Sequence, residues 1–368
     1  MARGLALAWE AEVGFQPHAL AVSADGSRAV AGLPGMIAAW DAHTGSALGT
    51  FAGAKAGLDH LALSRDGSAI ASWGGWQNKQ PTLWTAGKKG LRGKRLKLQF
   101  TAAVEGIAFH PDGARALAAD IGGLLTLFEV ASGAVIRTWD SGRYAPTIVR
   151  FLPETDGVLV AKNDELTEWD IESGRARRGV ALGLGNGNNS IFAPHPDGRH
   201  IAMATAHSDR SPCVVVDTGT FTVVQRTDPR PQVRAIQYDP DGARLLILAD
   251  RGSELETWKA DGSERLSTFK AVTAEEWRDH DLGTYGSLHP LPDGAHVAAV
   301  VTTRAVHSVA VFAVASRARV FEWRPRVEAP GDFSPVTRLA VGEGGDVFAC
   351  STAGFSERSF FAFLTWRA

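Results

Sequence analysis

One short turn recurs along the whole chain and constrains the fold more than any other feature. Each copy is Asp-Gly or a close variant between two apolar segments, and successive glycines lie 41 to 52 residues apart. Asp-Gly in this setting is typical of a β-hairpin, because glycine accepts a positive φ and the aspartate bonds the local backbone. The eight copies are residues 24–26, 65–67, 111–113, 155–157, 196–198, 240–242, 292–294 and 343–344.

The stretches around the first seven of these turns each contain four apolar segments. The third segment often ends on a large aromatic residue, and a glycine turn leads into the fourth. A four-stranded repeat of about 45 residues has the size of a β-propeller blade, and such a unit needs neighbours to cover its faces. We therefore predict an all-β chain, a single β-propeller domain over residues 1–368, with repeats that begin near residues 18, 58, 104, 145, 190, 233, 285 and 336.

The last repeat decides the number of blades. It has three apolar segments and reaches Trp366 without a fourth, whereas residues 5–10 form an unassigned apolar segment at the other terminus. We predict that residues 1–16 hold the closing outer strand of the last blade, which removes an open sheet edge. Eight blades are the first prediction, and seven blades with one misread repeat are the alternative.

The repeats resemble those of the WD-repeat propeller family along essentially the whole chain. Residues 109–113 (FHPDG) are similar to the first turn of that family, and residues 40–45 (WDAHTG) and 169–174 (WDIESG) to its Trp-Asp and Gly signature. WD repeats often carry an Asp six residues before the Trp, and that Asp is missing here, so the repeats are divergent. The equivalent positions hold Pro34, Asn78, Gly122, Asn163, Arg210, Gly252, Val306 and Glu357.

Composition argues against several classes of protein. Lys plus Arg total 38 against 40 for Asp plus Glu, so the chain has no global field for nucleic acid or anionic membrane. Cys213 and Cys350 are too few for a disulfide framework or a four-thiolate zinc site, and we expect both to be buried as small apolar side chains. The first apolar run stops at Glu10 and no later run reaches 18 residues. We expect a cytoplasmic protein with no membrane partner and take a monomer as the default.

Motifs for catalysis are not recognised. The sequence has no Gly-x-Ser-x-Gly and no His-Glu-x-x-His. His110 and His195 precede Pro-Asp-Gly and are interpreted as turn residues, and the glycine-rich residues 183–189 lack the Lys-Ser/Thr ending of a phosphate loop. We assign no catalytic residue, no cofactor and no metal site from the sequence.

Basic residues concentrate in residues 88–97, where six of ten side chains are cationic. The preferred interpretation is a solvated outer strand that lysine protects from edge pairing. The alternative is a binding segment for an acidic partner.

The extra residues of the longer repeats fall mainly between the second and third strands and between blades. Variable loops on a rigid scaffold tend to carry function, and aromatic residues beside Arg are typical of interface hot spots. The leading hypothesis is a non-catalytic scaffold that binds a protein or peptide, and the alternative is an enzyme of hydrolase or lyase type with a polar site in the mouth of a central channel. The candidate interface residues are Trp73, Trp76, Trp277, Arg278, Arg304, His307, Arg326, Phe333, Phe355 and Arg358.

Overall fold

The computed structural model describes most of the chain as strands, turns and bends. Residues outside the description are 1–3, 14–16, 53–57, 75–80, 88–89, 97–99, 101, 143–147, 153–155, 163, 185–189, 206–211, 229–232, 234, 240, 250–253, 271–287, 292–294, 303–306, 315, 317, 325–335, 342–346, 353–358 and 368. The described residues contain no helix, so the all-β prediction is confirmed for them. Accordingly, no described helical segment has the length and apolar character of a bilayer span.

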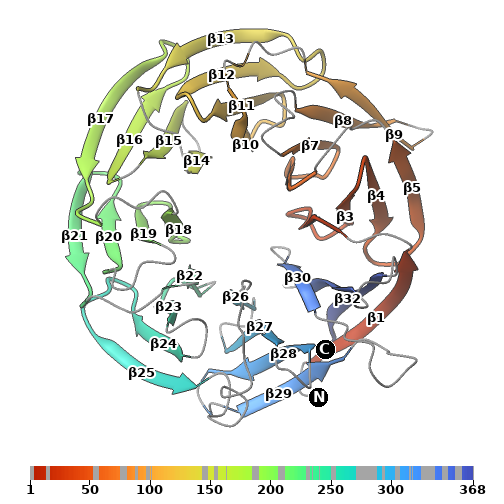
Figure 1. The fold of residues 1–368 in the computed structure, drawn as a ribbon. Helices are drawn as coiled ribbons and strands as arrows, with labels where there is room; N and C mark the ends of the chain where they lie inside the picture. Colours follow the sequence, from red (N-terminus) through yellow and green to blue (C-terminus); the bar gives the residue numbers. More distant parts are fainter. Residues whose placement is uncertain are drawn as a thin grey trace. The chain divides into compact units, whose positions relative to one another are not determined.

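The strands follow one another at short intervals (Figure 1). In chain order they are β1 (Gly4–Val13), β2 (Ala19–Val22), β3 (Arg28–Leu33), β4 (Met36–Asp41), β5 (Ala47–Ala52), β6 (His60–Leu63), β7 (Ala69–Trp73), β8 (Thr82–Gly87), β9 (Gly90–Arg95), β10 (Val104–Phe109), β11 (Arg115–Asp120), β12 (Leu124–Glu129), β13 (Val135–Asp140), β14 (Ile148–Phe151), β15 (Gly157–Lys162), β16 (Glu165–Asp170), β17 (Arg175–Ala181), β18 (Ser190–Pro194), β19 (His200–Thr205), β20 (Val214–Asp217), β21 (Thr222–Arg226), β22 (Ala235–Tyr238), β23 (Arg244–Ala249), β24 (Glu254–Lys259), β25 (Arg265–Lys270), β26 (Leu288–Pro290), β27 (His296–Thr302), β28 (His307–Ala313), β29 (Ala318–Trp323), β30 (Val336–Val341), β31 (Val347–Thr352) and β32 (Ser359–Arg367).

These strands form eight four-stranded sheets. Seven sheets take their strands from one continuous stretch of chain in sequence order, from β2-β3-β4-β5 to β26-β27-β28-β29, and the eighth has the order β1-β32-β31-β30. The first strands of the repeats begin at residues 19, 60, 104, 148, 190, 235, 288 and 336. This repeated four-stranded antiparallel unit defines the chain as a β-propeller.

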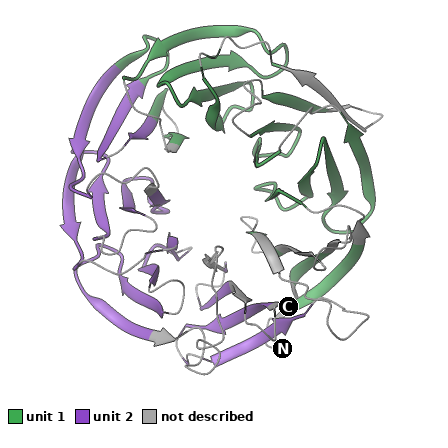
Figure 2. Ribbon diagram, in the orientation of Figure 1, with its two compact units in different colours: residues 1–158, 170–175, 326–368 green, residues 159–169, 176–325 purple. Residues whose placement is uncertain are grey.

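The chain divides into two compact units, coloured in Figure 2. Unit 1 comprises residues 1–158, 170–175 and 326–368, and unit 2 comprises residues 159–169 and 176–325.

The core of each unit lies between the faces of successive sheets. In unit 1, Ala29, Ala31 and Trp40 form one cluster with Phe361 and Phe363. In unit 2, one cluster joins residues of sheet β18–β21, such as Ala202 and Val215, to residues of sheet β22–β25, such as Ile247. Small residues on the second strands let the next sheet approach closely, and the large residues of the third strands fill the space.

Strand β1 ties the two ends of the chain together within unit 1. It pairs antiparallel with β32, with Leu5 opposite Trp366 (Figure 1, where red β1 lies beside blue β32). Its Trp9 stacks on Phe363 at 5.7 Å between ring centroids, and the Trp9 indole donates a hydrogen bond to the Ala42 carbonyl at 2.8 Å. Strand β1 therefore joins the last sheet to the first by backbone and side-chain contacts.

The basic segment, residues 88–97, includes an edge strand. Its residues 90–95 form β9, which is the terminal strand in the order β6-β7-β8-β9. An edge position is the one that the solvated-strand interpretation requires.

Deletion of residues 1–12 tests the role of β1. The deletion removes the pairing with β32 and the Trp9 packing, and loss of a packed Trp alone costs about 3 to 5 kcal/mol. We expect a sharply lower Tm in thermal unfolding, whereas removal of residues 271–283 should change Tm little. Equal Tm values for the two deletion variants would contradict the role given to β1.

Candidate functional site

Most of the predicted interface residues lie outside the described residues. His307 begins β28, but its side chain is not among those described. The interface prediction therefore stays a prediction at the positions outside the description, which are Trp76, Trp277, Arg278, Arg304, Arg326, Phe333, Phe355 and Arg358.

Trp73 is described, and its expected place in an exposed loop is wrong. It is the last residue of β7, pairs with His60 and is 5% exposed. Its indole stacks on the His60 ring and donates a hydrogen bond to the Glu105 carbonyl at 3.2 Å. Strand β7 extends to this residue, so the ring joins the core cluster between two sheets of unit 1.

Each sheet has a regular end and a variable end. The connections between first and second strands all have five residues, from 23–27 to 342–346. Those between second and third strands run from two residues (34–35) to eight (206–213), and those between sheets reach 17 residues at 271–287. In an antiparallel meander, alternate connections fall at opposite ends of the sheet. Connections between third and fourth strands fall at the same end as the five-residue turns and have two to five residues, so the long connections are all at the other end.

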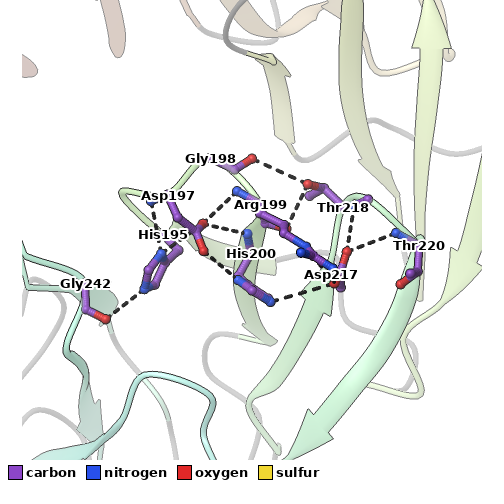
Figure 3. Close-up of polar contacts among 10 residues, drawn as sticks. His195, Asp197, Gly198, Arg199, His200, Asp217, Thr218, Thr220 and Gly242 are labelled. Atoms are coloured by element: carbon purple, nitrogen blue, oxygen red, sulfur yellow. Dashed lines mark hydrogen bonds and ion pairs between the residues drawn. The ribbon is translucent and has the colours of Figure 1, made fainter.

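A group of ionisable side chains occupies the regular end of sheet β18–β21 (Figure 3). His195 and Asp197 lie in the turn between β18 and β19, and His200 begins β19. His195 Nδ1 is 2.9 Å from Asp197 Oδ1, and His200 Nδ1 is 2.8 Å from Asp197 Oδ2. The His195 side chain is 15% exposed, whereas those of Asp197 and His200 are 38% and 32% exposed. The group thus has a buried side and a side open to solvent.

The next sheet of unit 2 fixes the His195 ring. His195 Nε2 is 2.7 Å from the Gly242 carbonyl, and the ring meets the Tyr238 ring edge-on. A carbonyl oxygen only accepts hydrogen bonds, so Nε2 donates to Gly242, and Nδ1 on the other side of the ring accepts the Asp197 amide at 3.1 Å. Gly242 has a φ of +71°, and a Cβ there would lie 2.6 Å from His195 Cε1.

The two carboxylates of this region are strongly acidic. Burial alone would raise the pKa of Asp197, but hydrogen bonds from the Arg199 amide and the His200 side chain and amide outweigh it and lower the pKa to about 2. The Arg199 guanidinium, with the Thr220 and Gly219 amides, lowers the pKa of Asp217 to about 2. His200 lies between the two carboxylates, with Nε2 3.9 Å from Asp217 Oδ2.

The equivalent turn of unit 1 carries an arginine where His200 stands. Arg115 Nε is 2.8 Å from Asp112 Oδ2, and the same guanidinium contacts Asp156 at 3.2 Å and Glu172 at 3.0 Å. His110 Nε2 faces Arg115 Nη2 at 3.4 Å. Arg115 therefore supplies the positive charge that the carboxylates of that turn require.

Two imidazole nitrogens and a carboxylate are ligands that divalent transition metals prefer. The three ligand atoms lie within 4.8 Å of one another, and this is the one such group identified among the described residues. Sequence reasoning treated His195 as a turn residue and missed its relation to His200. The spacing His195-x-Asp197-x-x-His200 across a five-residue turn was the available signal.

Cys213 has no part in this group. It is fully buried, as predicted, and burial raises the pKa of its thiol to about 12. A thiol in this state is a poor nucleophile and a poor metal ligand.

No protein-family model and no curated protein matches this chain. The β-propeller architecture therefore rests on the strands and sheets themselves, and membership of the WD-repeat family stays a prediction.

Substitution Gly242→Ala tests the contact between the two sheets of unit 2. Alanine would have to adopt a positive φ, and its methyl group would meet the His195 ring. We therefore expect a loss of about 1 to 3 kcal/mol in unfolding free energy. Gly198→Ala is the matched control, because Gly198 has the same φ of +71° and open space around its Cβ position. Chemical denaturation measures both. An equal loss in the two variants would refute the packing role of Gly242.

Asp66 in the turn between β6 and β7 gives a pH-dependent prediction. The Ser64 hydroxyl, at 2.7 Å, and the Ser68 amide hold the pKa of Asp66 below its usual value. A lowered pKa stabilises the fold at neutral pH, and this contribution disappears as the pH falls below about 4. We expect Asp66→Asn to lower Tm at pH 7 and to approach the wild-type Tm at pH 3. A Tm difference that is constant with pH would contradict this.

Proposed function

We propose that this β-propeller is a non-catalytic protein-interaction scaffold that binds a protein or peptide at the variable ends of its sheets. The carrying observation is the contrast between the two ends: no connection at one end exceeds five residues, whereas those at the other end run from two to 17 residues. Connections that differ in length on a constant framework create a surface specific to this chain.

The residues of the variable connections favour this proposal. Trp277 and Arg278 share one connection between sheets and Arg326 and Phe333 share the next, whereas Arg304 and Phe355 belong to connections between second and third strands. Aromatic anchors with a polar rim supply most of the binding energy in protein interfaces.

The regular ends offer less to a partner. Their side chains bond the turns themselves, as Ser64 bonds Asp66 and as Thr44 bonds Asp41 at 2.9 Å. Groups already engaged in this way would have to exchange one hydrogen bond for another on binding, with little net gain.

A partner captured with the tagged protein from the native cell extract, once identified and purified, allows a direct test. We expect the combined variant Trp277→Ala, Phe333→Ala and Phe355→Ala to bind at least tenfold more weakly, about 1.4 kcal/mol, with little change in Tm. Isothermal titration calorimetry measures the affinity.

Charge reversal at Lys94, Arg95 and Lys97 is the control and should leave the affinity unchanged. A combined variant that unfolds early yet binds normally when folded would mean that the three rings cap the sheets. Loss of binding with a steep salt dependence in the charge-reversal variant would favour an acidic partner on β9 instead.

A further inference from the structure

The turn that holds His195, Asp197 and His200 brings two imidazole rings and a carboxylate within 4.8 Å of one another. His195 Nε2 donates to the Gly242 carbonyl, and the Asp197 amide approaches His195 Nδ1 at 3.1 Å. Nδ1 accepts this amide hydrogen and also lies 2.9 Å from Asp197 Oδ1, so a ring nitrogen and a carboxylate oxygen face the same point.

His200 adds a second ring to the group. Its Nδ1 faces Asp197 Oδ2 at 2.8 Å, and its Nε2 lies on the side of Asp217. Asp197 Oδ1 also accepts the Arg199 and His200 amides, at 2.7 and 3.1 Å, so one carboxylate holds the turn backbone and faces both rings.

Arginine side chains pair with carboxylates at both of the equivalent turns. Arg199 directs Nε and Nη2 to Asp217 Oδ2, at 3.0 and 2.9 Å, and contributes its backbone amide to Asp197. In the equivalent turn of unit 1, Arg115 fills this role directly on Asp112. The β18–β19 turn therefore keeps the aspartate of that arrangement and replaces its cation with a metal-ligating side chain.

We propose that His195 Nδ1, His200 Nδ1 and the Asp197 carboxylate bind one Zn²⁺ or a similar divalent transition ion. Zinc lies about 2.0 to 2.2 Å from nitrogen and oxygen ligands, so ligands of one ion are at most about 4.2 Å apart. Each ring nitrogen already lies within 2.9 Å of an Asp197 oxygen, and all three ligand atoms lie within 4.8 Å, so a small movement brings them around one ion.

The surroundings match those of a bound ion. The Gly242 carbonyl holds the far nitrogen of His195, as a backbone carbonyl commonly does for a metal-ligating histidine. Two imidazoles disfavour Ca²⁺ and Mg²⁺, which prefer oxygen ligands. Three protein ligands leave a fourth position for water or for a partner's side chain. This site lies at the regular end of its sheet, so it does not depend on the proposed interface.

Competition with a chromophoric chelator for Zn²⁺ tests the proposal on the full chain. We expect one Zn²⁺ per wild-type chain and at least tenfold weaker binding by His200→Arg, which copies the turn of unit 1. His43→Ala is the matched control, because His43 is an exposed turn histidine and its loss should leave the affinity unchanged. Zn²⁺ should raise the Tm of the wild type and not that of His200→Arg.

Asp197→Asn is a second variant in case His200→Arg alters the fold, and it should also bind at least tenfold more weakly. Wild-type protein loaded with Co²⁺ should show the visible absorption of a four-coordinate site. Zn²⁺ binding that is equal in the wild type and both folded variants would overturn the proposal. Displacement of Zn²⁺ by millimolar Mg²⁺ would overturn it as well.

Discussion

Burial of sheet faces against neighbouring sheets is the constraint on which the rest of this structure depends. A four-stranded sheet has two faces, and adjacent residues of a second strand that point to opposite faces, such as Val30 and Ala31, are both fully buried. Each core cluster draws on two successive sheets, as where Leu246 and Leu255 meet Phe312 in unit 2. A single sheet cannot shield both of its faces from water. Each Å² of apolar surface left exposed costs about 25 cal/mol of stability, so neighbouring sheets must cover the faces.

Glycines in the turns allow each sheet to pack closely against the next. Gly45 has a φ of +71°, and a Cβ there would lie 2.6 Å from the Trp9 ring. Gly242 repeats the arrangement in unit 2 with His195. In both turns glycine meets two requirements at once, since it supplies the left-handed conformation and leaves room for the adjacent sheet. One of these close approaches also orients the ring that we assign to the metal site.

The sequence was informative where structure is local. Asp-Gly turns and the apolar runs beside them located the strands, because hairpin geometry depends on a few adjacent residues. The burial of Trp73 was not predictable, since it depends on one residue at the end of β7. The contact of His195 with Gly242 spans 47 residues and exists only because two sheets stack. The Arg199 guanidinium binds Asp217, the last residue of β20, so its direction likewise depends on a residue of another strand.

The central claim is that recognition occurs at the variable ends of the sheets, while the regular ends serve structure and, in one turn, metal binding. Hydrogen–deuterium exchange of the chain with and without its captured partner tests this most directly. The account predicts that the partner protects residues 271–287 and 324–335 and leaves the five-residue turns, such as 195–199 and 239–243, unchanged. Protection confined to the five-residue turns would contradict it.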